Sequence, residues 1–422
     1  MSDRAGKTVL VAHPGAAHFI YELVNAVGAL GFAPRFETGF YHDDAGVLGR
    51  LTALLPARLG ARLARELGRR RFAGIDPAIV HRHPLLELPY VAAARLLPHR
   101  PDAVERVLYW RNRCFDASVA AAIARRPPAI AIGHDTSALR LLRAARQAGA
   151  KTVLNQVIGH LAVGDRILRD EAARHPEFAD SLHAGAPGWL IEQCRAEALE
   201  ADCVLAPSDY VRRTLIEQGV APERIALLPF GVRVERFKPP AAPRDDGVFR
   251  LLYVGQISQR KGIKYLLEAV KTLARRDLEL VLVGGIVGSG AGLAPYRDWF
   301  RHVPNVPHAE VQRLFQSADL FVYPSLHEGS ALAIFEAMAS GLPVITTENA
   351  GSMVRDGIDG CLVPLRDPAA IAARIAELQD DPARRYAMAA SARQRAEQFT
   401  WGHYRERLGG VLDALIAGAP VT

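Results

Sequence analysis

The stretch "HEGSALAIFEAMASGLPVI", residues 327–345, holds two glutamates eight positions apart in an otherwise small and apolar segment. Its pattern predicts a helix from about Ser330, closed by the Gly-Leu-Pro turn at 341–343, and then a buried strand. Buried carboxylates are unfavourable unless they are paired, so Glu328 and Glu336 need partners. Two interpretations stay open at this point: a helix cap with an ion pair, or a ligand site at a helix start.

Short apolar segments alternate with longer helical patterns along the whole chain. Continuous apolar strands joined by helices are typical of parallel sheets that are covered on both faces. The expected strands lie at 7–13, 129–133, 151–155, 202–207, 224–229, 250–255, 278–284, 319–325 and 343–347. The alternation restarts near residue 248, after a stretch rich in proline and charge that is typical of a linker.

This alternation predicts an α/β protein with two Rossmann-like, doubly wound parallel-sheet domains that face a cleft. We place the first domain at residues 1–235, the linker at 236–247 and the second domain at 248–399. Residues 400–422 carry one more amphipathic helical pattern. We expect this last helix to cross back onto the first domain.

Composition and cysteine use are those of a globular chain. Of 422 residues, 50% are hydrophobic and 23% are charged. The sequence has no run of 18 apolar residues and no signal-peptide pattern, which favours a cytoplasmic location. The four cysteines show no close CxxC pairing, so the sequence predicts neither a disulfide scaffold nor a metal site.

The net charge of +7 favours anionic partners, and much of the excess is local. Residues 50–71 contain seven arginines and a single acid, with leucines spaced for an amphipathic helix. Three interpretations stay open: a solvated helix face, docking on an anionic membrane surface, or nucleic-acid binding. No zinc-finger, basic-zipper or aromatic RNA-binding motif accompanies the arginines, so we do not expect a nucleic-acid partner.

The first strand of each predicted domain runs into a turn that contains glycine. Gly15 follows the first strand, and Arg260 and Lys261 stand in the second turn, just before a helical pattern. A glycine here lets backbone amides approach a phosphate, and the two cations could clamp a diphosphate. The alternatives are an ordinary tight turn and two solvated cations.

The stretch 324–364, read as a whole, resembles the donor-site signature of retaining GT-B glycosyltransferases. That family includes sucrose synthases, bacterial glycogen synthases and lipid mannosyltransferases. Its hallmark is Glu, seven residues, Glu, which Glu328 and Glu336 match. The resemblance continues through "LLPFGVRVERF" (227–237), "YVGQISQRKG" (253–262) and "FTWGHYRERL" (399–408). It covers most of the chain.

The resemblance implies a GT-B fold and the transfer of a sugar from a nucleotide-diphosphate sugar, without a metal or other cofactor and with retention of anomeric configuration. Glu328 would contact the donor sugar, Glu336 would hold the nucleotide ribose, and Lys261 would neutralise the diphosphate. The implied donor-binding residues are Gly15, Gln256, Arg260, Lys261, Glu328, Gly329, Ser330, Ala331, Leu332 and Glu336. The implied catalytic residues are Glu328, His160 and Lys261.

The sequence departs from the family pattern in the second-domain turn, where Gln256 replaces a frequent arginine. A glutamine donates hydrogen bonds but cannot neutralise charge, so Arg260 is expected to compensate. In the first domain, His160 resembles a histidine that lies near the reacting sugar; an ordinary loop histidine is the alternative. Strand-end residues His134 and Asp135 are expected to contact acceptor or sugar. The same contact is expected of Glu171.

The expected partners are a nucleotide sugar and a glycan or lipid-linked acceptor, with peripheral binding to an anionic membrane through residues 50–71. Two alternatives keep the fold: a catalytically inactive nucleotide-sugar-binding relative, and a nucleotide-sugar epimerase. A nicotinamide-dependent dehydrogenase would need a GxGxxG turn, which "HPGAAHF" at 13–19 lacks. The sequence leaves the donor base, the donor sugar and the acceptor undecided.

Overall fold

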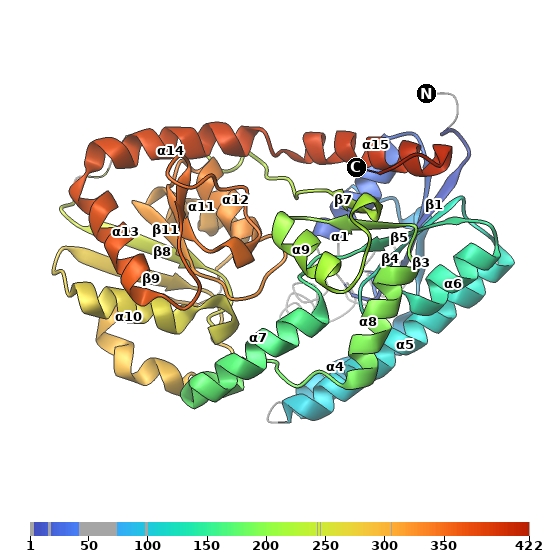
Figure 1. The fold of residues 1–422 in the computed structure, drawn as a ribbon, viewed down its shortest axis with the longest axis horizontal. Coiled ribbons are helices and arrows are strands. Elements are labelled where there is room, and N and C mark those ends of the chain that lie inside the picture. The colour runs from blue at the N-terminus through green and yellow to red at the C-terminus, as the bar shows by residue number, and fades with distance from the viewer. Residues whose placement is uncertain are drawn as a thin grey trace, which may run out of the picture.

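The chain forms two α/β domains that lie side by side (Figure 1). The computed structural model describes residues 4–15, 18–41, 74–97, 100–242, 244, 246–304 and 306–421. The basic segment 50–71, for which a membrane-binding helix is one interpretation, lies outside these residues. The two-domain, parallel-sheet architecture predicted from the alternating pattern is confirmed.

The first domain is built on a parallel sheet. Among the described residues, seven strands pair in the order β3-β2-β1-β4-β5-β6-β7, and each neighbouring pair is parallel. The strands are β1 (Thr8–His13), β2 (Ala33–Thr38), β3 (Val80–Arg82), β4 (Ile130–His134), β5 (Lys151–Asn155), β6 (Cys203–Ala206) and β7 (Ile225–Leu227). This is the doubly wound order, in which ligands bind at the carboxyl ends of the strands.

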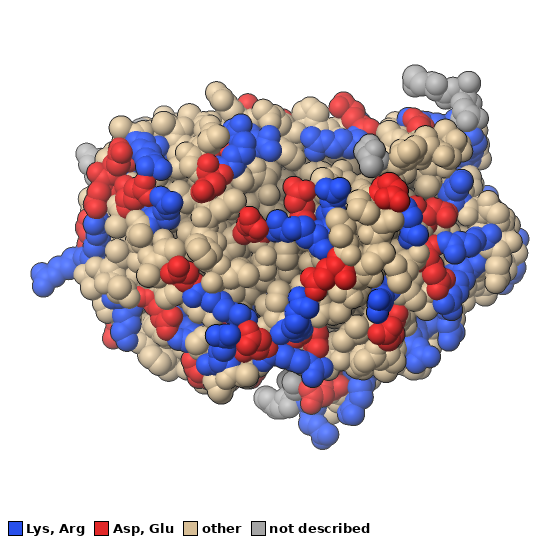
Figure 2. Space-filling model, in the orientation of Figure 1, with Lys and Arg blue, Asp and Glu red and all other residues tan. Residues whose placement is uncertain are grey.

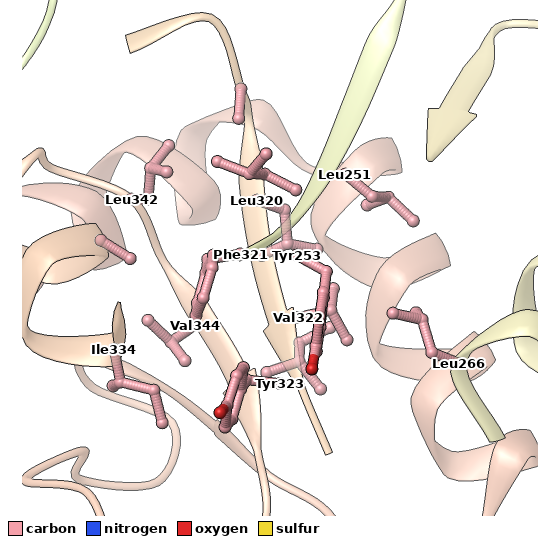
Figure 3. Close-up of a cluster of buried hydrophobic side chains, with 14 of the residues drawn as sticks. Leu251, Tyr253, Leu266, Leu320, Phe321, Val322, Tyr323, Ile334, Leu342 and Val344 are labelled. Carbon is pink, nitrogen blue, oxygen red and sulfur yellow. The ribbon is translucent and has the colours of Figure 1, made fainter. Parts of the chain in front are cut away.

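The second domain repeats the arrangement. Six described strands pair in parallel in the order β10-β9-β8-β11-β12-β13. They are β8 (Phe249–Val254), β9 (Leu278–Val283), β10 (Arg301–Val303), β11 (Leu320–Tyr323), β12 (Val344–Thr346) and β13 (Gly360–Leu362). The central strands bury both faces, and Figure 3 shows Tyr253, Phe321 and Tyr323 at the centre of that core. The Tyr253 and Tyr323 rings stack with their centroids 5.3 Å apart.

Helices cover the two sheets. In the first domain they are α1 (His18–Ala29), α4 (Pro84–Leu96), α5 (Pro101–Arg125), α6 (Leu139–Gln147), α7 (Leu161–Arg174), α8 (Gly188–Glu200) and α9 (Asp209–Glu217). In the second they are α10 (Ile263–Leu273), α11 (His308–Gln316), α12 (Leu332–Ala339), α13 (Pro368–Asp380) and α14 (Pro382–Glu397). Short 3-10 turns include η2 (Pro176–Ser181), η4 (Gln259–Lys261) and η5 (Ala291–Trp299).

The last helix, α15 (Trp401–Ala417), returns to the first domain as the sequence predicts. Helices α14 and α15 run along one edge of the molecule and so cross from one domain to the other (Figure 1). Apolar residues of α15 such as Leu408 and Leu412 are buried in the first-domain core together with Leu23 and Val27 of α1. Burial of this apolar stripe holds the end of the chain on the first domain.

A second crossing was not predicted. Helix α7 and the turn η2 precede residue 235, yet they extend against the second domain (Figure 1). Phe178 of η2 is buried in the second-domain core, and Ser181 Oγ accepts a hydrogen bond of 3.0 Å from the backbone N–H of Gln259. Both α7–η2 and α14–α15 therefore tie the two domains together.

Four strands were not among those expected: β2, β3, β10 and β13. Each is short or contains charged residues, which weakens the apolar pattern. In β2, Arg35 and Glu37 are both buried and form an ion pair of 2.6 Å, and His83 lies 2.8 Å from the other oxygen of Glu37. A buried charge is tolerated when it is paired in this way, but a single sequence does not show the pairing.

Candidate functional site

The loop that connects β11 with α12 carries an ion cluster. Arg260 contacts the Glu328 carboxylate at 3.2 Å, and Lys261 forms an ion pair with the same oxygen. The Lys261 side chain is buried, so its ammonium depends on the Glu328 carboxylate as its partner. Its ammonium lies 5.3 Å from the centre of the Tyr323 ring. The structure therefore brings together Arg260, Lys261 and Glu328, three of the residues predicted to serve the donor.

The same loop contacts the first domain closely. The backbone carbonyl of Gly329 accepts a hydrogen bond of 2.5 Å from Ser208 Oγ, and the Gly159 N–H donates to the Glu328 carbonyl at 3.2 Å. A Cβ placed on Gly329 would overlap the carbonyl oxygen of Val157. His327 is buried against Tyr210, with 2.6 Å between its Nδ1 and the phenolic oxygen. Gly329 is thus required by the close approach of two backbones.

Burial and cationic neighbours determine the charge state of His327. Desolvation, followed by the positive charges of Arg260 and Lys261, lowers the pKa of His327 to about 3. The imidazole is therefore neutral at physiological pH and acts as a hydrogen-bonding group between the domains.

Helix α12 begins at Leu332, two residues later than predicted, and ends before Gly341, which has a φ of +74°. The backbone N–H of Ala331, one of the implied donor-binding residues, donates to the Ala350 carbonyl at 3.2 Å, so this amide is not free for a phosphate. Ser330 Oγ is buried and has no hydrogen-bond partner among the residues that the structure describes. An unsatisfied buried hydroxyl next to a helix start is a suitable donor for a ligand.

Glu336 lies one turn beyond Leu332 on α12, and both line a cavity of about 310 Å³ between the domains. First-domain His18 and the connecting residue Arg236 line it as well, with Trp401 of α15. Desolvation raises the pKa of Glu336 to about 7, against a smaller opposite effect of Arg236. Arg236 and Trp401 were not among the predicted site residues, although both lie in segments that carry the family resemblance.

The turn after β8 places its predicted residues differently. Gln256 is exposed, and its backbone carbonyl accepts a hydrogen bond of 2.6 Å from the Tyr253 hydroxyl. Gly262 follows η4 with a φ of +72°, and a Cβ there would overlap the Pro324 carbonyl. The left-handed backbone at Gly262 brings η4, with Arg260 and Lys261, against the end of β11.

In the first domain, the ends of β1 and β4 bring Gly15, His134 and Asp135 into one region. His13 Nδ1 lies 2.6 Å from the Gly15 carbonyl, and the His13 and His134 rings are 4.3 Å apart. Burial raises the pKa of Asp135 to about 7, whereas a hydrogen bond from Gln156 opposes the rise. These groups stand at the carboxyl edge of the sheet, where a doubly wound fold binds its ligands.

His160 is the N-cap of α7 and is fully buried. Its Nδ1 accepts the N–H of Ala162 at 3.2 Å, and its backbone N–H donates to Thr214 Oγ1 at 2.9 Å. Desolvation lowers the pKa of His160 to about 4. Its neighbour Gly159 contacts the Glu328 loop, so the backbone of this segment reaches the site while the ring caps a helix.

Glu171, predicted to contact the acceptor or the sugar, lies between the two domains. Its carboxylate is fully buried, and both oxygens accept hydrogen bonds from the second domain. Gln259 donates at 2.6 Å and Tyr265 at 2.7 Å to one oxygen, and Arg366 donates at 2.7 Å to the other. In this structure Glu171 is closed off from any acceptor, and its contacts join α7 to the second domain.

No group of three or more His, Cys, Asp or Glu side chains in the described part of the chain is arranged to hold a metal ion. No described helix has both the length and the apolar character needed to cross a membrane.

A family model, Glycosyl transferases group 1, matches residues 248–381. A D-inositol 3-phosphate glycosyltransferase of Thermomonospora curvata is 31% identical over 319 residues, which are 57% of this chain and 73% of the relative. The chain belongs to the glycosyl transferases group 1 family. A relative of the same name from Catenulispora acidiphila is 35% identical over 47% of this chain. The match spans only 54% of the length of that relative.

Solved structures show the fold over nearly the whole of this group 1 chain. Sucrose-phosphate synthase of Thermosynechococcus elongatus superimposes with a TM-score of 0.66 at 18% identity, covering 98% of this chain and 100% of the other. Anabaena HepE in complex with UDP and glucose gives a TM-score of 0.63 at 15% identity, with 97% and 100% covered. Together with the two sheets, these matches confirm the predicted GT-B fold.

Proposed function

We propose that this protein transfers a sugar from a nucleotide-diphosphate sugar to an acceptor, with retention of anomeric configuration and without a metal. The observation that carries the proposal is the placement of Glu336 in a cavity between the domains, on the helix that follows the Glu328 ion cluster. A carboxylate recessed in such a cavity is suited to accept the two hydroxyls of a ribose. The UDP and UDP-glucose bound by the HepE structures make uridine nucleotides the first donors to test.

The ion cluster suggests how the leaving group is stabilised. Negative charge grows on the departing diphosphate as the bond to the sugar breaks. Lys261 and Arg260 are held at Glu328 before the donor arrives, so they are already oriented when that charge develops. The buried Ser330 hydroxyl supplies a further donor. Glu328, once the diphosphate binds the two cations, is free to accept hydroxyls of the donor sugar.

Retention and metal independence have direct tests. The anomeric configuration of the product, measured by NMR, is expected to match that of the donor. Transfer is expected to continue at an unchanged rate in excess EDTA. An inverted product, or loss of activity that added divalent metal restores, would contradict these parts of the proposal.

Donor binding is expected to stabilise the folded protein. A ligand at one hundred times its Kd adds about 2.7 kcal/mol to the free energy of unfolding, which corresponds to a Tm increase of roughly 3 °C for a chain of this length. We expect one of the UDP-, GDP- and ADP-sugars to give this shift in the wild type and none to do so in Glu336→Ala. The matched control is Glu397→Ala, which removes an exposed carboxylate of the second domain and should leave the shift intact. No shift with any nucleotide sugar would reject the donor site.

The raised pKa of Glu336 gives a pH prediction. Because burial makes the folded state hold this proton more tightly than the unfolded state, ionisation of Glu336 lowers stability as the pH rises from about 4.5 to about 7. Relative to Glu336→Gln, the wild type should therefore lose stability over this range, by roughly 3 kcal/mol at most. Because Glu336 is partly exposed, screening by water makes the stability difference between the two proteins smaller than this limit. Urea unfolding of both proteins at pH 5 and pH 8 measures it; an equal change in both would contradict the prediction.

For the acceptor we propose a glycan or lipid-linked sugar, met at a membrane surface. Helix α4 supports this, because Leu85, Leu88 and Leu96 are 76%, 61% and 78% exposed. Exposed leucines near arginines are suited to an anionic bilayer. The relatives named D-inositol 3-phosphate glycosyltransferase favour a second candidate, a soluble polyol phosphate. Sedimentation with anionic vesicles, compared between the wild type and the double variant Leu85→Ser/Leu88→Ser, distinguishes the two candidate acceptors. Equal binding by both proteins, or no binding by either, would contradict the proposal that the acceptor is met at a membrane surface.

A further inference from the structure

A second cavity, of about 490 Å³, lies on the first domain alone. It is formed by α5, the start of α6 and the start of α8, whereas the predicted donor residues other than Gly15 lie in the second domain. Its lining is rich in aromatic rings and arginines: Arg106, Tyr109, Trp110, Arg113, Arg140 and Trp189. None of these residues belongs to the site described above.

The sequence of α5 explains the lining. Arg106, Trp110 and Arg113 are spaced four and three residues apart, so they share one face of the helix. Arg140 comes from the first turn of α6, and Trp189 from the first turn of α8. Three segments that are separated in the sequence thus supply one cavity.

The aromatic side chains are arranged as a wall. The Tyr109 and Trp189 rings meet edge to face at 6.1 Å, and the Arg113 guanidinium lies 5.2 Å from the Trp189 ring centre. Trp110 and Trp189 nevertheless remain 48% and 44% exposed. Large rings left open to solvent in a concave site are typical of a surface that stacks on a ligand.

The arginines have unused binding capacity. Arg106, Arg113 and Arg140 are exposed, and none of the three side chains forms a hydrogen bond or ion pair with a residue that the structure describes. Figure 2 shows basic side chains gathered at the lower right, over α5 and α6. Guanidinium groups pair with phosphate through two parallel hydrogen bonds, so this cavity is suited to a phosphorylated ligand.

We propose that the cavity between α5, α6 and α8 binds a phosphorylated saccharide, with the sugar ring on Trp110 and Trp189 and the phosphate on the arginines. The choice of a saccharide over a nucleotide rests on the proposed function, which makes the first domain the acceptor side. The same chemistry is present in a free sugar phosphate and in the headgroup of a lipid-linked sugar phosphate. The site would hold the charged part of the acceptor.

The first experiment measures binding without any donor. Glucose 6-phosphate is titrated into the whole protein, and the fluorescence of its four tryptophans, two of which line the cavity, is followed. Arg113→Glu is expected to raise the Kd at least tenfold, and Trp189→Ala about fivefold. Both side chains are exposed, and circular dichroism verifies that each variant is folded. The matched control, Arg276→Glu, reverses an exposed arginine of the second domain and should bind like the wild type.

Further titrations decide which class of ligand binds and in which cavity it binds. Neutral glucose should bind at least tenfold more weakly, and adenosine monophosphate or inorganic phosphate no better than glucose 6-phosphate. Equal binding by Arg113→Glu, or tighter binding of the nucleotide, would overturn the proposal. Binding should survive in Glu336→Ala, because that variant affects only the donor cavity; loss there, with Arg113→Glu unaffected, would place the ligand in the donor site and overturn it as well. Glucose 1-phosphate and its decyl diester then distinguish a free source from a lipid source.

Discussion

Alanine at Gly329 is expected to prevent the two domains from meeting. The new Cβ would overlap the Val157 carbonyl oxygen. Because the atoms it would meet belong to the backbone, no flexible side chain can move aside to relieve the clash. The hydrogen bond from Ser208 to the Gly329 carbonyl would be lost with the contact. Displacements of about 1 Å in an active site reduce rates roughly a hundredfold, so we expect a loss of sugar transfer of that size or more.

Small-angle scattering measures the same change without an activity assay. Gly329→Ala is expected to have a larger radius of gyration than the wild type, while circular dichroism shows that the secondary structure is kept. The matched control is Gly410→Ala, because a Cβ there meets nothing within 4 Å and alanine favours the helix by up to about 1 kcal/mol. A Gly329→Ala protein with wild-type scattering and a wild-type rate would disprove the requirement for this close contact.

Removing the Glu171 carboxylate is the second change with a large expected effect. Glu171→Ala leaves Arg366 without its buried partner and removes the acceptor of Gln259 and Tyr265. Arg366 keeps a second carboxylate, Asp170 at 2.8 Å, so the expected loss comes mainly from the buried hydrogen-bonding groups left unpaired, at about 1 to 3 kcal/mol each. We expect a loss of this size in urea unfolding, with the two domains unfolding in separate transitions because α7 no longer holds them together.

The control for this variant is Glu217→Ala, which removes an exposed carboxylate whose partner is Arg166. Exposed pairs contribute about 0 to 1 kcal/mol, so its unfolding should stay close to that of the wild type. A Glu171→Ala protein that unfolds in a single transition at the wild-type midpoint would show that the α7 contacts do not stabilise the domain arrangement.

Much of the donor half could be predicted because its signals are local. The alternation of apolar strands with helices located nine strands, and the segment around Glu328 and Glu336 predicted a loop, a helix and a strand that the structure contains. Gly341 with its positive φ closes that helix as expected. In contrast, β2 was missed because its buried Arg35 and Glu37 read as surface residues when their pairing is unknown.

The sequence by itself therefore determined the fold class, the family resemblance and the segments that carry the donor site. The tertiary structure alone decided which side chains face the site and which hold the domains together. Glu171 and Arg366 are 195 residues apart in the chain, and the rings and arginines of the α5 cavity come from three separate segments. Periodicity reports only which face of an element is apolar, and the partner that a polar side chain meets depends on how distant elements pack.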